Sequence, residues 1–121
     1  MKALLSLAVL AIFALPAHAD CTYPAAPTHI PDGATATLDE MVAAQKAVKA
    51  FDQQITEYTS CIKLEEAAQL KGDKLTEDQK KAIQAQQAAK NNAAVDADQA
   101  LADRLNEQIR AFKAKQSGNK S

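Results

Sequence analysis

A seven-residue repeat of apolar residues dominates the hydrophobic pattern between residues 38 and 71. The repeat consists of Met41, Val48, Ile55 and Ile62 at one position and Ala44, Phe51 and Tyr58 at the other. Residues three and four apart share one face of an α-helix, so the repeat predicts a helix with a narrow apolar seam. Thr37 and Glu40 have the spacing of a capping box, which predicts a helix over residues 38–71. Leu38 and Val42 are expected to widen the apolar stripe.

A second helix is predicted over residues 77–115, with a weaker apolar pattern. Thr76 and Gln79 form another capping-box pair at its start. Its expected seam positions are Ile83, Gln87, Ala94, Val95, Leu101, Leu105, Ile109 and Phe112. Gln87 and Asp98 are polar residues in this seam. Either the seam drifts, as a straight helix does against a seven-residue repeat, or these side chains meet a partner.

The short link between the two predicted helices makes them antiparallel neighbours. The sequence therefore predicts an all-α fold, a coiled-coil-like two-helix hairpin over residues 37–116, with a disordered tail at 117–121. The neighbours expected across the hairpin are Phe51 with Val95, Val48 with Leu101, and Met41 with Leu105.

Residues 20–36 form a proline-rich segment that we call the arm. Its three prolines exclude a helix and favour an extended polyproline conformation. Cys21 in the arm and Cys61 in the first helix are expected to form one structural disulfide. To reach Cys61 the arm has to run back along the hairpin and pack in its groove. The residues expected in this packing are Tyr23, Pro24, Pro27, Ile30, Phe51 and Tyr58.

Residues 1–19 have the pattern of a secretory signal peptide. The positively charged Lys2 precedes an apolar run over residues 3–15, and an Ala-His-Ala motif predicts cleavage between Ala19 and Asp20. The apolar run is shorter than the ~20 residues that a membrane span needs, so no span is expected in the mature chain. We expect a periplasmic or secreted protein with a disulfide.

Charge and candidate chemistry narrow the functional classes. The chain has 14 Lys and Arg residues against 15 Asp and Glu, which gives no basic surplus for nucleic acid. His29 is the single histidine after residue 19, and no metal-ligand spacing or nucleophile–base pattern surrounds it. Three pairs of acidic residues are adjacent in sequence: Asp39 with Glu40, Glu65 with Glu66, and Glu77 with Asp78. The two side chains of each pair point about 100° apart on a helix, so they do not form a catalytic pair. We therefore expect no enzyme activity, no cofactor and no metal site.

Two resemblances bear on function. The Cys-x-x-Pro-x-x-Pro-x-x-Ile-Pro-Asp-Gly-Ala-Thr stretch at residues 21–35, followed by Tyr58-x-x-Cys61, resembles small uncharacterised exported proteins of proteobacteria. In those proteins a proline arm with one cysteine precedes a long helix that carries the second. That resemblance covers residues 21–66 and implies no particular activity.

The second resemblance is shorter. Leu75-Thr76-x-x-Gln79 is similar to the LTxxQ motif of Spy-type periplasmic chaperones, which are all-helical and cradle unfolded clients. The motif occurs once and coincides with the second capping box. The sequence thus predicts a non-enzymatic helical interaction or structural protein, which binds another protein or a second copy of itself. The alternative is a periplasmic stress chaperone that binds unfolded clients.

Overall fold

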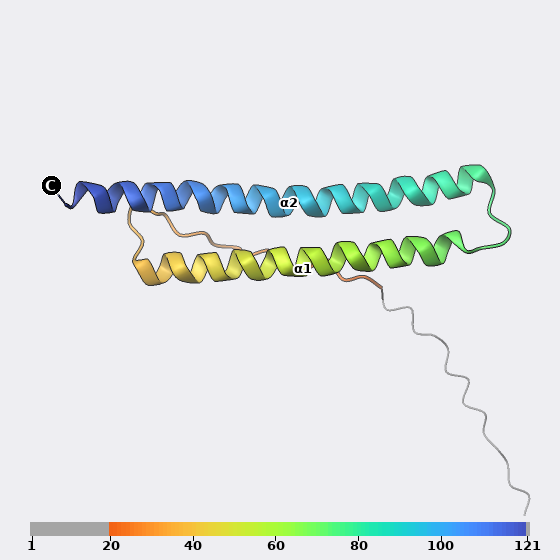
Figure 1. The fold of residues 1–121 in the computed structure, drawn as a ribbon, viewed down its shortest axis with the longest axis horizontal. Coiled ribbons are helices and arrows are strands. Elements are labelled where there is room, and N and C mark those ends of the chain that lie inside the picture. The colour runs from red at the N-terminus through yellow and green to blue at the C-terminus, as the bar shows by residue number, and fades with distance from the viewer. Residues whose placement is uncertain (1–19, 121) are drawn as a thin grey trace, which may run out of the picture.

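The computed structural model describes residues 20–120, and two long antiparallel helices make up most of this part of the chain (Figure 1). Helix α1 spans Leu38–Leu70 and helix α2 spans Glu77–Gly118, and no strand occurs within residues 20–120. The predicted fold class, an all-α hairpin with an arm pinned by one disulfide, is confirmed. The predicted signal peptide lies outside the described residues.

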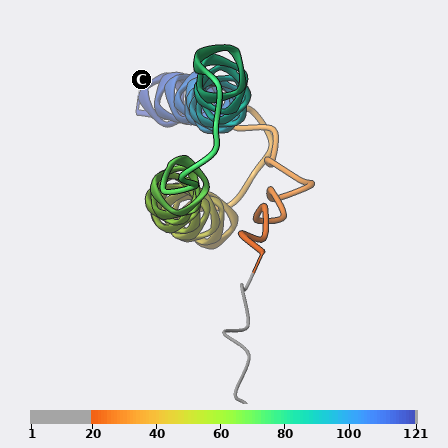
Figure 2. The same ribbon diagram turned by 90° about the vertical axis from the view of Figure 1, so that its right-hand side faces the viewer.

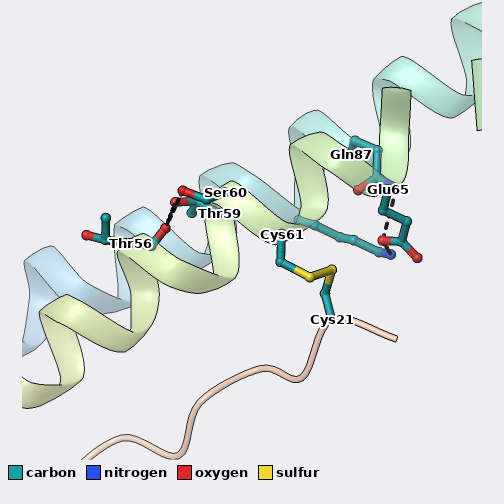
Figure 3. The surroundings of a disulfide bond; sticks show 8 residues. Cys21, Thr56, Thr59, Ser60, Cys61, Glu65 and Gln87 are labelled. Atoms are coloured by element: carbon teal, nitrogen blue, oxygen red, sulfur yellow. Dashed lines mark hydrogen bonds and ion pairs between the residues drawn. A yellow bond between two sulfur atoms is a disulfide. The ribbon is translucent and has the colours of Figure 1, made fainter. Parts of the chain in front are cut away.

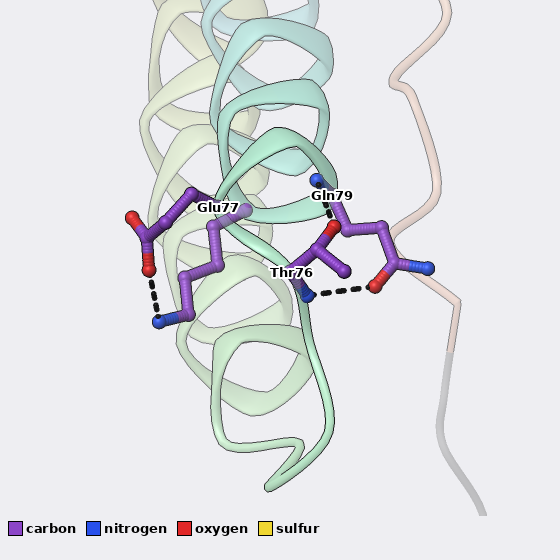
Figure 4. Close-up of polar contacts among 4 residues, drawn as sticks. Thr76, Glu77 and Gln79 are labelled. Carbon is purple, nitrogen blue, oxygen red and sulfur yellow. Dashed lines mark hydrogen bonds and ion pairs between the residues drawn. The ribbon is translucent and has the colours of Figure 1, made fainter.

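Both helices begin where their capping boxes predict. The Thr37 hydroxyl accepts a hydrogen bond from the Glu40 amide at 3.2 Å, and the Glu40 carboxylate accepts from the Thr37 amide at 2.7 Å. Thr76 and Gln79 make the same reciprocal pair at the start of α2, at 3.2 and 2.9 Å (Figure 4). Each cap satisfies two amides that otherwise lack an intrahelical partner.

The C-terminal boundaries differ from the prediction. Helix α1 ends at Leu70, one residue earlier than expected. Helix α2 continues to Gly118, so two residues assigned to a disordered tail are helical, and residues 119 and 120 form a turn. The residues before the tail are rich in good helix formers and include no proline, so no residue before Gly118 interrupts the helix. Ser121 lies outside the described residues.

The apolar core is a single seam between the helices, and its register corrects two details of the prediction. Val95 is 46% exposed, whereas Ala94 is buried against Phe51 and the rest of the main cluster. Met41 packs with Phe112 rather than with Leu105, which belongs to the main cluster. Helix α2 is thus rotated relative to the expected pairing, because its buried positions follow Ala94 and not the residue after it.

Two residues that were expected to widen the stripe of α1 do not do so. Leu38 and Val42 are both exposed. Around the helix, Leu38 lies about 60° and Val42 about 100° from the seam position of Met41, both on the same side of it. The seam is therefore as narrow as its seven-residue repeat, which leaves the outer faces of both helices to solvent.

The arm runs back along the hairpin and lies on one side of the two helices (Figure 2). A turn at residues 33–35 brings it against α2, where the Gly33 amide donates to the Gln108 side chain at 2.9 Å. A Cβ atom on Gly33 would lie 1.8 Å from the Gln108 carbonyl oxygen, so only glycine fits this close approach. Further along, the Lys115 ammonium donates to the Ala36 carbonyl at 3.0 Å.

Candidate interaction surface at the disulfide

The disulfide between Cys21 and Cys61 joins the start of the arm to the C-terminal third of α1 (Figure 3). The two Cα atoms are 5.8 Å apart, and residues 20–120 contain no free cysteine. The pairing expected from the sequence is confirmed. Because Gly33 holds the other end of the arm on α2, the arm is anchored to both helices.

The arm residues that were expected to pack in the groove make different contacts. Tyr23 lies against Tyr58 with the ring centroids 5.2 Å apart in an edge-to-face arrangement, which is a favourable geometry for aromatic rings. Ile30 packs against the main core cluster, to which Phe51 belongs. Pro24 and Pro27 are half-buried along the arm.

A shallow hollow of about 610 Å³ lies where the arm crosses α1 beside the disulfide. Its lining residues are Thr22, Tyr23, Pro24, Ala25, Gln54, Glu57, Tyr58 and Cys61. Glu57 supplies the charge among them. The hollow therefore combines two aromatic rings, a proline and one carboxylate on a surface that is fixed by a covalent bond.

An exposed leucine extends this surface along α1. Leu64 is 74% exposed, the highest value among the exposed large apolar side chains of residues 20–120. It follows Cys61 by three residues and Glu57 by seven, so it lies on the same side of the helix as both. Next to it, Glu65 forms an ion pair with Lys90 of α2 at 3.6 Å (Figure 3).

The polar seam residues are built into the hairpin itself. Gln87 is 3% exposed and its amide nitrogen donates to Glu65 at 3.5 Å, while its oxygen is buried without a hydrogen-bond partner. It shares a strict seven-residue spacing with the buried Ala94 and Leu101. The seam of α2 therefore does not drift, and the polar side chains occupy true seam positions. Whether they meet a partner stays an open prediction.

Asp98 is another polar residue between the helices. Its Oδ1 atom is buried without a hydrogen-bond partner. Burial first, and the neighbouring carboxyl of Asp52 second, raise the pKa of Asp98 above its ordinary value. The raised pKa favours a protonated Asp98, whose carboxyl group can donate a hydrogen bond to the carboxyl of Asp52 on the facing helix.

The remaining candidates for chemistry are spread along the chain. His29 is exposed and lines a second hollow of about 310 Å³ together with Pro31 and Glu40. Hydrogen bonds from the Thr37 amide and hydroxyl, in that order, lower the pKa of Glu40, which follows from its capping role. Within residues 20–120 no group of three or more His, Cys, Asp or Glu side chains is arranged to hold a metal ion.

Neither helix in the described part of the chain is both long and apolar enough to cross a membrane. Comparisons with protein-family models, with characterised proteins and with solved structures found no match to this chain.

Two features of this surface were missed by sequence reasoning. Gly33 belongs to the turn at residues 33–35, and its larger role is the close approach to the backbone of α2. Leu64 falls outside the seven-residue repeat of α1, and this offset was the signal that it would be exposed. A large apolar residue on the polar side of a regular repeat needs a separate explanation.

Proposed function

We propose that the chain is an exported, non-enzymatic helical protein that acts by binding another protein or a second copy of itself. The observation that carries the proposal is the exposure of Tyr23 and Leu64 around the anchored disulfide. Within residues 20–120, eight large apolar residues are buried in the seam between the helices, and Tyr23 and Leu64 are not among them. Aromatic and apolar side chains left outside a core commonly supply the anchors of protein interfaces.

Export is supported by two independent features. The leader-like pattern of residues 1–19 predicts secretion, and the disulfide between Cys21 and Cys61 needs an oxidising compartment to persist. The disulfide also anchors the arm that carries Tyr23. A periplasmic or secreted location would therefore keep this surface assembled.

The proposal is tested with the oxidised protein lacking residues 1–19. Light scattering after size-exclusion chromatography measures self-association, and immobilised protein captures partners from periplasmic extract in competition with free protein. We expect either a concentration-dependent dimer or saturable capture of a defined protein. A monomer at every concentration, together with no capture that free protein competes away, would contradict the proposal.

The chaperone alternative has no specific observation in its favour. Thr76 and Gln79 of the LTxxQ-like motif are engaged with each other in the capping box of α2, and Leu75 is half-buried at the loop. The alternative is tested by aggregation of an unfolded client at equimolar protein. Clear suppression that Leu75→Ala removes without lowering the melting temperature would make the chaperone function the better proposal.

A further inference from the structure

We propose that the surface made by Tyr23, Pro24, Glu57, Tyr58 and Leu64, here called the disulfide platform, binds an extended segment of another protein. The segment presents a Lys or Arg side chain about three residues from an apolar residue. This inference rests on the proposed interaction function and names its site and the chemistry of its partner.

The exposed aromatic rings of residues 20–120 lie at the disulfide platform. Phe51 and Phe112 are buried in the seam, whereas Tyr23 is 46% exposed and Tyr58 is half-buried beside it. The aromatic surface that residues 20–120 offer to solvent is therefore concentrated at the disulfide platform. Tyrosine is enriched at binding hot spots, because its ring buries a large area and loses little conformational entropy.

The hollow of the disulfide platform carries a negative charge. Glu57 lines the hollow beside both tyrosines, and no basic residue is among the lining residues. Asp20, which precedes the bridged Cys21, is exposed as well. A cation placed over a tyrosine ring and beside a carboxylate gains both cation–π attraction and ion pairing. This charge complementarity selects a Lys or Arg side chain and disfavours an acidic one.

Leu64 places a large apolar side chain beside the hollow. Leu64 lies on the same side of α1 as Glu57, two helical turns further along, and is 74% exposed. Two helical turns correspond to about 11 Å, which an extended peptide covers in about three residues. A basic residue at Glu57 and an apolar residue at Leu64 can therefore belong to one short segment.

The disulfide platform is held in place before a partner binds. Tyr23 lies two residues from Cys21, whose bond to Cys61 fixes this part of the arm on α1. The edge-to-face contact with Tyr58 holds the Tyr23 ring in place. A surface that is ordered before binding loses less entropy when the partner arrives.

The test uses the tyrosines themselves as the probe. The chain contains two tyrosines and no tryptophan, and both tyrosines lie in the disulfide platform, so tyrosine emission reports on this surface. A blocked nonapeptide, Gly-Leu-Gly-Gly-Arg-Gly-Gly-Leu-Gly, places a Leu three residues from the Arg on either side and is titrated to millimolar concentrations into the oxidised protein. A second peptide carries Gln in place of Arg. We expect a saturable emission change, with about tenfold weaker binding of the Gln peptide.

Matched variants localise the effect. Glu57→Gln and Leu64→Ala should each weaken binding of the Arg peptide by about threefold to tenfold, because each removes one exposed contact. Leu38→Ala is the control, since Leu38 is also exposed on α1 but lies at its first residue. Circular dichroism should show the same helix content for all three variants.

The outcomes separate the inference from the proposed function. No saturable change, equal binding of the Arg and Gln peptides, or equal effects of Leu38→Ala and Leu64→Ala would each overturn the inference. If the protein still captures a partner and the double variant Glu57→Gln/Leu64→Ala captures it equally well, the proposed function stands and the disulfide platform is the wrong site.

Discussion

The half of the hairpin that the arm covers and the half next to the loop follow the same repeat, but their seams differ in composition. In the covered half, Val48, Phe51, Ile55, Leu101 and Leu105 fill the seam. In the loop half, between residues 62 and 94, the buried position is occupied by Gln87, with Glu65 and Lys90 beside it. Apolar burial supplies most folding free energy, so the two halves should differ in local stability.

The difference between the two halves of the hairpin also explains why an arm is present. A two-helix seam leaves its edges open to water, and apolar residues at those edges gain little unless another layer covers them. Ile30 of the arm packs on the apolar half, where there is surface to cover, and the disulfide anchors the arm at the end of that half. The loop half offers little apolar surface and has no such cover (Figure 1).

The largest expected effect is a core truncation in the covered half. Phe51→Ala should lower the free energy of unfolding by about 3–5 kcal/mol, because Phe51 is almost fully buried in the main cluster. Gln53→Ala on the exposed side of the same helix should cost less than about 0.5 kcal/mol. Chemical denaturation of both variants measures the difference. Similar costs at the two positions would mean that the seam is assigned to the wrong face.

Removing the covalent anchor should be the next largest. Cys61→Ser should lower the free energy of unfolding by roughly 2–5 kcal/mol, since the bond restricts the unfolded chain over a separation of 40 residues. Much of the helical circular dichroism signal should remain, because each helix keeps its own capping box. Complete loss of helix would show that the arm is needed to form the hairpin at all.

At the other end of the arm, the contact with α2 depends on Gly33, which has no side chain. Gly33→Ala places a methyl group against the backbone of α2 and should cost about 1–3 kcal/mol, as an overpacked contact does. Gly118→Ala is the matched control, since a Cβ atom there meets nothing within 4 Å. Thermal denaturation compares the two. A neutral Gly33→Ala variant would contradict close contact between the arm and α2.

A smaller effect should depend on pH. Asp98 has a raised pKa in the folded protein, so the folded state binds its proton more tightly than the unfolded state does. Its contribution is most favourable at low pH and is lost as the pH rises from the ordinary carboxyl value through the raised one. Asp98→Asn should remove this pH dependence and stabilise the protein at neutral pH, whereas Asp103→Asn on the exposed face should not. Denaturation across acidic and neutral pH measures it.

The caps and the seam of α1 could be predicted from the sequence because their causes are local. A capping box spans four residues, and a seven-residue repeat defines one face of a helix without knowledge of its partner. The disulfide was also predictable, because a chain with two cysteines offers one intramolecular pairing. The exact register across the hairpin was not, since a shift of one residue exchanges Val95 for Ala94 with no change in local pattern.

The candidate surface was predicted only in part. Tyr23 and Tyr58 were both expected in the packing of the arm on the hairpin, and the structure brings their rings into contact with each other. The exposure of Leu64 and the contact of Gly33 with Gln108 depend on how the arm, α1 and α2 are placed in three dimensions. Such contacts join residues far apart in sequence, and no short motif encodes them.

We expect the covered half of the hairpin to hold the molecule together and the loop half to contribute little. Native-state hydrogen exchange, followed by mass spectrometry, tests this expectation most directly. We expect the slowest exchange at amides of residues 44–62 and 94–112, and exchange at residues 65–90 that is faster by at least about tenfold, which corresponds to about 1.4 kcal/mol in opening free energy. Equal protection along both helices, or slower exchange next to the loop, would contradict the account.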